Sequence, residues 1–352
     1  LWYPNNPTIL EYQNRYFQKL ISIVEEILGE NHRFYDMNVD EQKHFLLSPD
    51  ISSLLMDYYY KKSQDSQRKF EREIAILLLW EYDKLTSYLW EKIKWTDIYL
   101  TLQDNNPENI LVGHPDHDQD GMLGWWEKSP QEWIYVFSQS FALLKKVNSD
   151  FYKELNYIIK KIVPMKTSLD THNSCSYKER VWTLYLWYTI NVQHPELSIL
   201  EALIHESSHN KLNLNMQSEK LSLNDYELKY YSPYRPDARH IHGVYLWVHA
   251  IVPTVYILLQ AIESWYITDK QWQEKTLLYH VKNKLGYKVL QKYAKTTKIG
   301  RQILNDIWDV IMLSDKIIGR LEVMKDIDKA DIAQRAKDHF IDVKTNYPHL
   351  QY

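Results

Sequence analysis

Cysteine, glycine and proline are scarce in this chain of 352 residues. A single cysteine, Cys175, excludes an internal disulfide and a thiolate metal site, and it fits a reducing cytoplasm. With only 8 glycines and 12 prolines, the chain favours helices over a β-sandwich. No run of eighteen apolar residues and no signal peptide are visible, so we expect a cytoplasmic protein without a transmembrane helix.

The chain has no strong excess of positive or negative charge, since its net charge is only -4. This charge gives no reason to expect nucleic acid as a partner. Tyrosine and tryptophan are abundant; most should fill the core, although some could line a groove for an extended ligand. The length allows one large domain or two. We expect an N-terminal helical region over 1–165 and a metal-site catalytic region with C-terminal helices over 166–352, which could form one continuous domain.

Apolar residues recur at helical spacing along most of the chain, which predicts a mainly α protein. Pro164 should end the last helix of the first half, and 165–177 should be a polar loop. Residues 179–190, ERVWTLYLWYTI, predict a small β element packed beside the helix that follows it. Helices are expected over 8–28, 50–62, 67–93, 129–162 and 243–265, with further helices between 269 and 345.

An acidic segment interrupts the helical pattern between 96 and 128. Its spacing matches an EF-hand calcium loop, with Gly121 at the sixth position. The calcium ligands would be Asp116, Asp118, Asp120 and Glu127. However, the preceding residues 113–115, Gly-His-Pro, do not suit the end of a helix. Both interpretations therefore stay open, a calcium site or an acidic, solvated turn.

The most informative stretch is the H-E-x-x-H pattern from His205 to His209. Two histidines four residues apart on a helix lie on one face, so both imidazoles can bind a single metal ion. Ser198 and Glu201 form an S-x-x-E capping box, which predicts that the helix begins there, and Leu200, Leu203 and Ile204 give it an apolar face. The alternative is a helix with two ordinary polar histidines.

Two histidines hold a metal poorly, so we expect a third ligand. The leading candidate is His242, which opens the next helix, with Asp237 and His240 as nearby alternatives. A zinc peptidase would instead use a glutamate from the next segment, such as Glu219 or Glu227.

The loop over 230–243 carries two arginines, Arg235 and Arg239. Arginine binds carboxylates bidentately, and an arginine beside a histidine-rich metal site suits a 2-oxo acid cosubstrate whose far carboxylate needs a cation. Hydrolysis of a peptide bond has no such requirement. Structural ion pairs within the loop are the alternative. Glu206 is read as the general base of a zinc hydrolase or as an outer-sphere residue of an iron site.

The run LEALIHESSHNKL, followed by YYSPYRPDARHIHGVY, resembles the HExxH-type 2-oxoglutarate-dependent peptide β-hydroxylases, which act on ribosomally made peptides in bacterial natural-product pathways. The resemblance covers about 175–265. Four positions differ from the residues usual in that family: Ser207, Ser208, Tyr234 and Ala238. These differences bear on the identity of the substrate more than on the reaction. The matching residues are His205, Glu206, His209, Lys211, Leu212, Ser232, Pro233, Tyr234, Arg235, Asp237, Arg239, His242 and Gly243.

This resemblance implies a non-haem Fe(II) dioxygenase that uses 2-oxoglutarate and O2 to hydroxylate a side-chain β-carbon of a precursor peptide. The metal ligands would be His205, His209 and His242. The cosubstrate would be bound by Arg235, Arg239 and Lys211. Glu206 would be the catalytic residue. The competing hypotheses are a zinc metallopeptidase of the HExxH type and an inert peptide-binding module.

Overall fold

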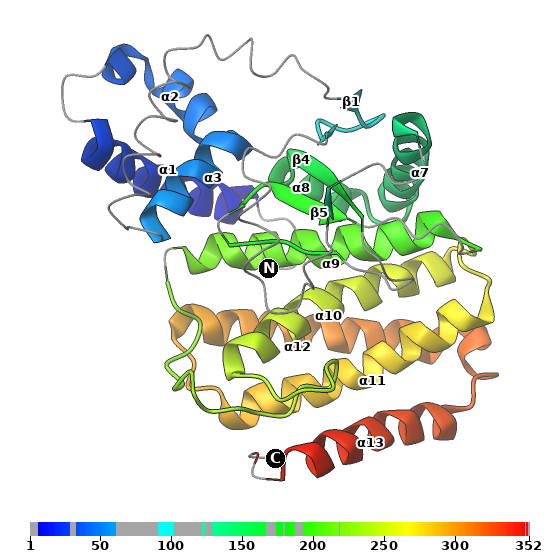
Figure 1. The fold of residues 1–352 in the computed structure, drawn as a ribbon. Helices are drawn as coiled ribbons and strands as arrows, with labels where there is room; N and C mark the ends of the chain where they lie inside the picture. Colours follow the sequence, from blue (N-terminus) through cyan, green and yellow to red (C-terminus); the bar gives the residue numbers. More distant parts are fainter. Residues whose placement is uncertain are drawn as a thin grey trace. The chain divides into compact units, whose positions relative to one another are not determined.

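The computed structural model shows a mainly α protein with a small β element, as the sequence predicts (Figure 1). The chain divides into two compact units. The N-terminal unit comprises Asn6–Leu143 and Tyr152–Ser218, and the C-terminal unit comprises Leu1–Asn5, Leu144–Phe151 and Glu219–Tyr352. The described residues are 6–28, 33–60, 91–101, 122–123, 129–166, 174–178, 180–186, 193–217, 219–348 and 350.

The N-terminal unit begins with three helices that pack on one another. The first and third, α1 (Asn6–Leu28) and α3 (Pro49–Tyr60), confirm the helices expected over 8–28 and 50–62. Between them, α2 (Val39–Leu46) starts with a reciprocal capping box, because the Asn38 side chain accepts from the Glu41 amide and the Glu41 carboxylate accepts from the Asn38 amide. Leu20, Leu46 and Leu55 are fully buried between these helices.

A small sheet forms around β4 (Lys161–Lys166). It pairs in parallel with β2 (Tyr99–Leu100) and with β5 (Thr183–Leu186), and antiparallel with β3 (Met122–Leu123). β5 lies inside the strand predicted over 179–190 and contacts the H-E-x-x-H helix, which confirms that prediction (Figure 1).

The helix expected over 67–93 falls mostly outside the described residues, and its last residues are not helical. Glu91–Lys92 forms β1, which pairs antiparallel with β2. A tight turn closes this hairpin, in which the Ile93 amide donates to the Ile98 carbonyl and Trp95 adopts a positive φ of 69°. The candidate calcium ligands Asp116, Asp118, Asp120 and Glu127 also lie outside the described residues.

The helix expected over 129–162 is interrupted once and ends at Ile158, earlier than predicted. It consists of α7 (Pro130–Val147) and α8 (Ser149–Ile158), separated by Asn148, whose side chain accepts from the Phe151 amide at 2.9 Å. Asparagine is a favoured helix N-cap, and here it starts a new helix.

Pro164 lies inside β4 opposite Leu186 and does not end a helix. Ile162 and Val163 precede it. Their β-branched side chains favour extended backbone, which a residue before proline also adopts. The strand therefore replaces both the end of the expected helix and the first residues of the expected loop.

The C-terminal unit contains four long helices, α10 (Ile241–Glu263), α11 (Lys270–Tyr293), α12 (Lys298–Arg320) and α13 (Lys329–Asn346). They confirm the helices expected over 243–265 and between 269 and 345. α10 packs against α11 and α12, and α13 packs against α11. α10 is long and apolar enough to cross a membrane by length and composition, but 78% of its most apolar stretch is buried, as in a core helix of a soluble protein.

Gly300 lets the start of α12 lie directly against the backbone of Leu221. A β-carbon at Gly300 would be 1.9 Å from the Leu221 carbonyl oxygen. That oxygen also accepts from the amide and the hydroxyl of Thr297, the N-cap of α12. The segment after residue 219 is thus anchored to α12 at a place where no larger residue fits.

Candidate metal centre

The H-E-x-x-H pattern lies on α9 (Pro195–Met216), which begins one turn earlier than predicted. His194 is the N-cap and Pro195 occupies the first turn, so Ser198 lies within the helix and does not cap it. Proline is favoured at the first helical position because its φ is already helical and it needs no N–H acceptor. The dipeptide His194-Pro195 was therefore the better start signal.

One face of α9 is fixed against β5 and the segment before it. The Asn210 side chain accepts from the Trp182 amide at 2.9 Å and donates to the Thr183 carbonyl at 3.0 Å. Two turns beyond, the Gln217 side-chain amide donates to the Lys178 carbonyl. The predicted apolar face is confirmed, with Leu200, Leu203 and Ile204 fully buried. Packing therefore sets the orientation of the helix and of its histidines.

His205 and His209 turn their imidazoles toward each other. Their Nε2 atoms are 3.0 Å apart, the ring centroids are 4.5 Å apart and the rings are perpendicular, at 89°. Burial lowers the pKa of His209 to about 4, so this ring is neutral at pH 7 and keeps a lone pair. Without a metal, one ring can donate a hydrogen bond to the other at this distance.

A shared metal ion would set the distance between the two Nε2 atoms. With metal–nitrogen bonds of about 2.1 Å, two nitrogens 3.0 Å apart subtend about 90° at the metal. A tetrahedral ion would hold them about 3.4 Å apart. Both spacings are close to the observed one, so the pair can reach a single ion with little movement of either ring. Among the described residues, no three His, Cys, Asp or Glu side chains gather into a metal site, so binding of a metal by His205 and His209 stays a prediction.

Glu206 is buried beside this pair, with Oε1 4.0 Å from Nε2 of His205. Ser174 and Ser176 each donate a hydrogen bond of 2.7 Å, one to each carboxylate oxygen. Burial raises the pKa of Glu206 to about 7, and the two serine hydrogen bonds oppose this rise. The carboxylate is therefore held in place beside the histidines and can exchange a proton near neutral pH.

No sequence motif marks the two serines as partners of Glu206. They flank Cys175, which forms an antiparallel bridge with Tyr185 of β5. Alternate residues of an extended segment point to the same side, so Ser174 and Ser176 both face α9. The Ser-x-Ser spacing was the available signal, but it has meaning only once this pairing is known.

Lys211 lies on another face of α9, because six residues separate it from His205. Its Nζ forms an ion pair of 2.7 Å with Glu154 of α8, and both side chains are largely buried. In this structure Lys211 joins α9 to α8. Its expected contact with a cosubstrate stays a prediction.

The loop before α10 in the C-terminal unit brings its two arginines together. Tyr230 and Arg239 form an antiparallel bridge that closes the loop. Asp237 lies between the arginines, with Oδ1 3.2 Å from Nε of Arg235 and Oδ2 2.7 Å from Nε of Arg239. Because both carboxylate oxygens already pair with a guanidinium, Asp237 is a poorer metal ligand than its sequence position suggests.

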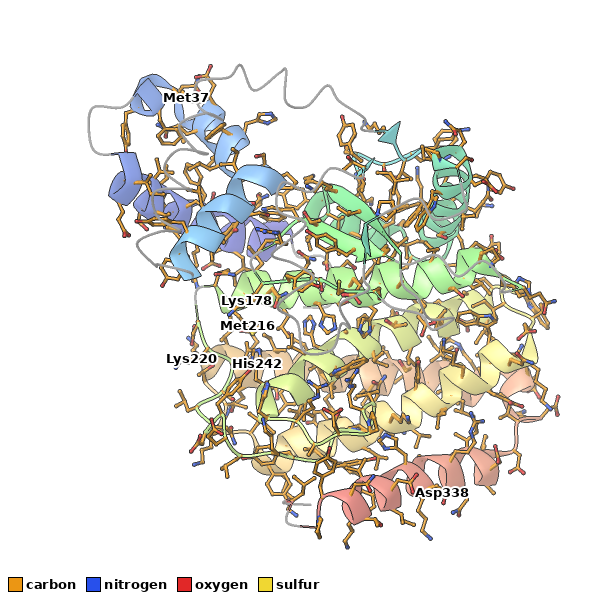
Figure 2. All side chains as sticks on the ribbon, viewed as in Figure 1. Met37, Lys178, Met216, Lys220, His242 and Asp338 are labelled. Atoms are coloured by element: carbon orange, nitrogen blue, oxygen red, sulfur yellow. The ribbon has the colours of Figure 1, made fainter. Side chains whose placement is uncertain are left out.

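His240 is the N-cap of α10, and its Nδ1 accepts from the Gly243 amide at 3.0 Å. Burial, and then the positive charges around it, lower its pKa to about 4. Neutral His240 therefore carries its proton on Nε2, and neither nitrogen has a lone pair left for a metal. His242, labelled in Figure 2, lies in the first turn of α10 with its ring 5.7 Å from that of His240.

The candidate residues thus form two groups. His205, Glu206 and His209 come together in the N-terminal unit, and the arginine-bearing loop with His242 belongs to the C-terminal unit. A bond from His242 to the same metal stays a prediction, and the alternatives Glu219 and Glu227 are exposed residues of the C-terminal unit. A search with models of known protein families and a search of curated proteins found no match for this chain.

Proposed function

We propose that this chain is an Fe(II)- and 2-oxoglutarate-dependent oxygenase that hydroxylates a side-chain β-carbon of a ribosomally made peptide in the bacterial cytoplasm. The observation that carries the proposal is the meeting of the His205 and His209 Nε2 atoms, 3.0 Å apart on one face of α9, where both can bind a single ion such as Fe(II). The resemblance over about 175–265 supports the choice of cosubstrate and peptide substrate.

His205, His209 and His242 would hold the iron, which when bound supplies O2-dependent oxidation of a C–H bond. His242 is preferred as the third ligand because Asp237 is paired with two arginines and His240 caps α10. Three neutral histidine ligands would not neutralise the double positive charge of the ion. The anionic cosubstrate would neutralise it.

Several features of the loop before α10 favour an anionic ligand. Arg235 and Arg239 are half-buried, and Asp237 orients both guanidinium groups. The N-terminus of α10 adds the partial positive charge of a helix end. In the proposal, one of the arginines binds the far carboxylate of 2-oxoglutarate.

Glu206 stays outside the ligand set in this proposal, because Ser174 and Ser176 engage both of its oxygens. It orients the neighbouring imidazole and takes up or releases a proton at Oε1 near neutral pH. The same buried glutamate is what favours the second candidate, a zinc metallopeptidase, in which it would be the general base.

One assay separates the two candidates. The purified chain is incubated with a peptide encoded beside its gene, either with Fe(II), 2-oxoglutarate and O2 or with zinc alone. We expect succinate and a peptide heavier by one oxygen atom, formed in equal amounts and only with iron. Cleavage fragments that depend on zinc and not on 2-oxoglutarate would establish the peptidase instead.

Replacing the clamp arginine should raise the KM for 2-oxoglutarate roughly 30-fold, since a charge-assisted hydrogen bond contributes about 2 kcal/mol. Arg235→Gln and Arg239→Gln are tested separately, by initial rates of succinate formation and by metal content, which should not change. Arg320→Gln is the control, because Arg320 pairs with Glu263 at the far end of α10 and α12. Unchanged KM values in both loop variants would exclude the clamp.

A further inference from the structure

A small apolar pocket opens in the C-terminal unit between α11, α13 and the loop that precedes α10. Its volume is about 160 Å³, and its walls include Tyr231, Leu285, Val289 and Phe340. A cavity of comparable size holds a benzene ring. The pocket is therefore large enough for one aromatic side chain.

The walls are suited to an aromatic ring. The rings of Tyr231 and Phe340 meet edge to face, with centroids 5.0 Å apart and planes at 84°. The Tyr231 hydroxyl lies 3.1 Å from Nδ1 of His339 on α13, and this hydrogen bond fixes the tyrosine. A third ring entering beside them could adopt the offset or edge-to-face contacts that aromatic pairs prefer.

The rim of the pocket is positively charged. Lys288 and Lys292 are exposed, lie one turn apart on α11 and line the pocket. Among the residues that the structure describes around it, no aspartate or glutamate lines the pocket. One turn earlier on the same stripe, Lys284 forms an ion pair with Asp315 at 2.6 Å, and at the pocket Lys292 lies over the ring of Tyr293, 4.7 Å from its centroid.

We propose that this pocket binds an acidic peptide segment through one aromatic side chain, with the neighbouring carboxylates held by Lys288 and Lys292. As a recognition site for the substrate peptide, it rests on the proposed function. Tyr231 belongs to the same loop as Arg235 and Arg239. A bound segment would therefore contact the loop that carries the candidate cosubstrate ligands.

The test measures binding alone, without metal or 2-oxoglutarate. A fluorescein-labelled synthetic peptide with one phenylalanine among glutamates is titrated with the full chain, and anisotropy is recorded. We expect about tenfold weaker binding when the phenylalanine becomes alanine, when lysines replace the glutamates, and in the variant with Lys288→Glu and Lys292→Glu.

The matched control carries Lys325→Glu and Lys329→Glu, which change the net charge equally. Lys329 lies about 16 Å along α13 from Phe340, and both lysines are exposed. Equal losses in the two double variants, or no effect of removing the phenylalanine, would overturn the proposal. So would a wild-type dimer that Leu285→Asp dissociates, since a second copy would then cover the pocket. Because no turnover is measured, a failed oxygenase assay leaves this result standing.

Discussion

His205→Ala is expected to weaken metal binding by more than about 100-fold and to abolish peptide hydroxylation. The reason is geometric, because two Nε2 atoms 3.0 Å apart become a single imidazole that cannot hold the ion alone. Metal content after loading with Fe(II) under anaerobic conditions measures the first effect, and product mass measures the second. Alanine is the best helix former, so α9 should persist, and circular dichroism checks this.

His194→Ala is the matched control, since His194 lies at the start of the same helix and its side chain pairs with the neighbouring Glu196, away from His205. It should bind metal as the wild-type chain does. Full metal content in His205→Ala would show that the ion, if any, binds elsewhere. Retained metal with lost hydroxylation would assign His205 to substrate binding, against the proposal.

Gly300→Ala is expected to lower the free energy of unfolding of the C-terminal unit by about 3 kcal/mol. Its new β-carbon would meet the Leu221 carbonyl oxygen at 1.9 Å, and the neighbouring atoms belong to backbone, which cannot rotate away. The segment at Leu221 must then move off α12, and it loses the hydrogen bonds from Thr297. Urea denaturation followed by tryptophan fluorescence measures the change.

Gly319→Ala on the same helix gives the matched control. A β-carbon there has no neighbour within 4 Å, and the residue is exposed. Alanine is favoured over glycine in a helix by about 1 kcal/mol, so this variant should be as stable as the wild-type chain or more so. If Gly300→Ala were equally harmless, the close approach of α12 to Leu221 would not exist in solution.

The local part of the candidate site could be predicted from sequence because helix geometry fixes it. His205, Glu206 and His209 are neighbours on any α-helix, and the structure places them side by side. The two serines that hold Glu206 could not be predicted, because their orientation depends on the pairing of Cys175 with Tyr185, which no local pattern encodes.

Helix types and positions were largely predictable, whereas some boundaries and one strand were not. At α9 two start signals compete, and the proline at 195 takes precedence over the Ser198 capping box. At β4 the apolar run continues the pattern of α8, so only pairing with β5 shows that it is a strand. His240 stood as an alternative third ligand by sequence, because its capping bond to the Gly243 amide can be recognised only once the turn is known.

The packing of α9 on β5 through Asn210 has a practical consequence for handling the protein. Hydrogen bonds from the Asn210 side chain to the backbone at Trp182 and Thr183 orient this helix. The imidazoles of His205 and His209 therefore keep their positions without a bound ion. In the proposed oxygenase, a chelator should therefore remove the iron without melting the fold, and the stripped protein should accept cobalt, nickel or manganese as spectroscopic substitutes.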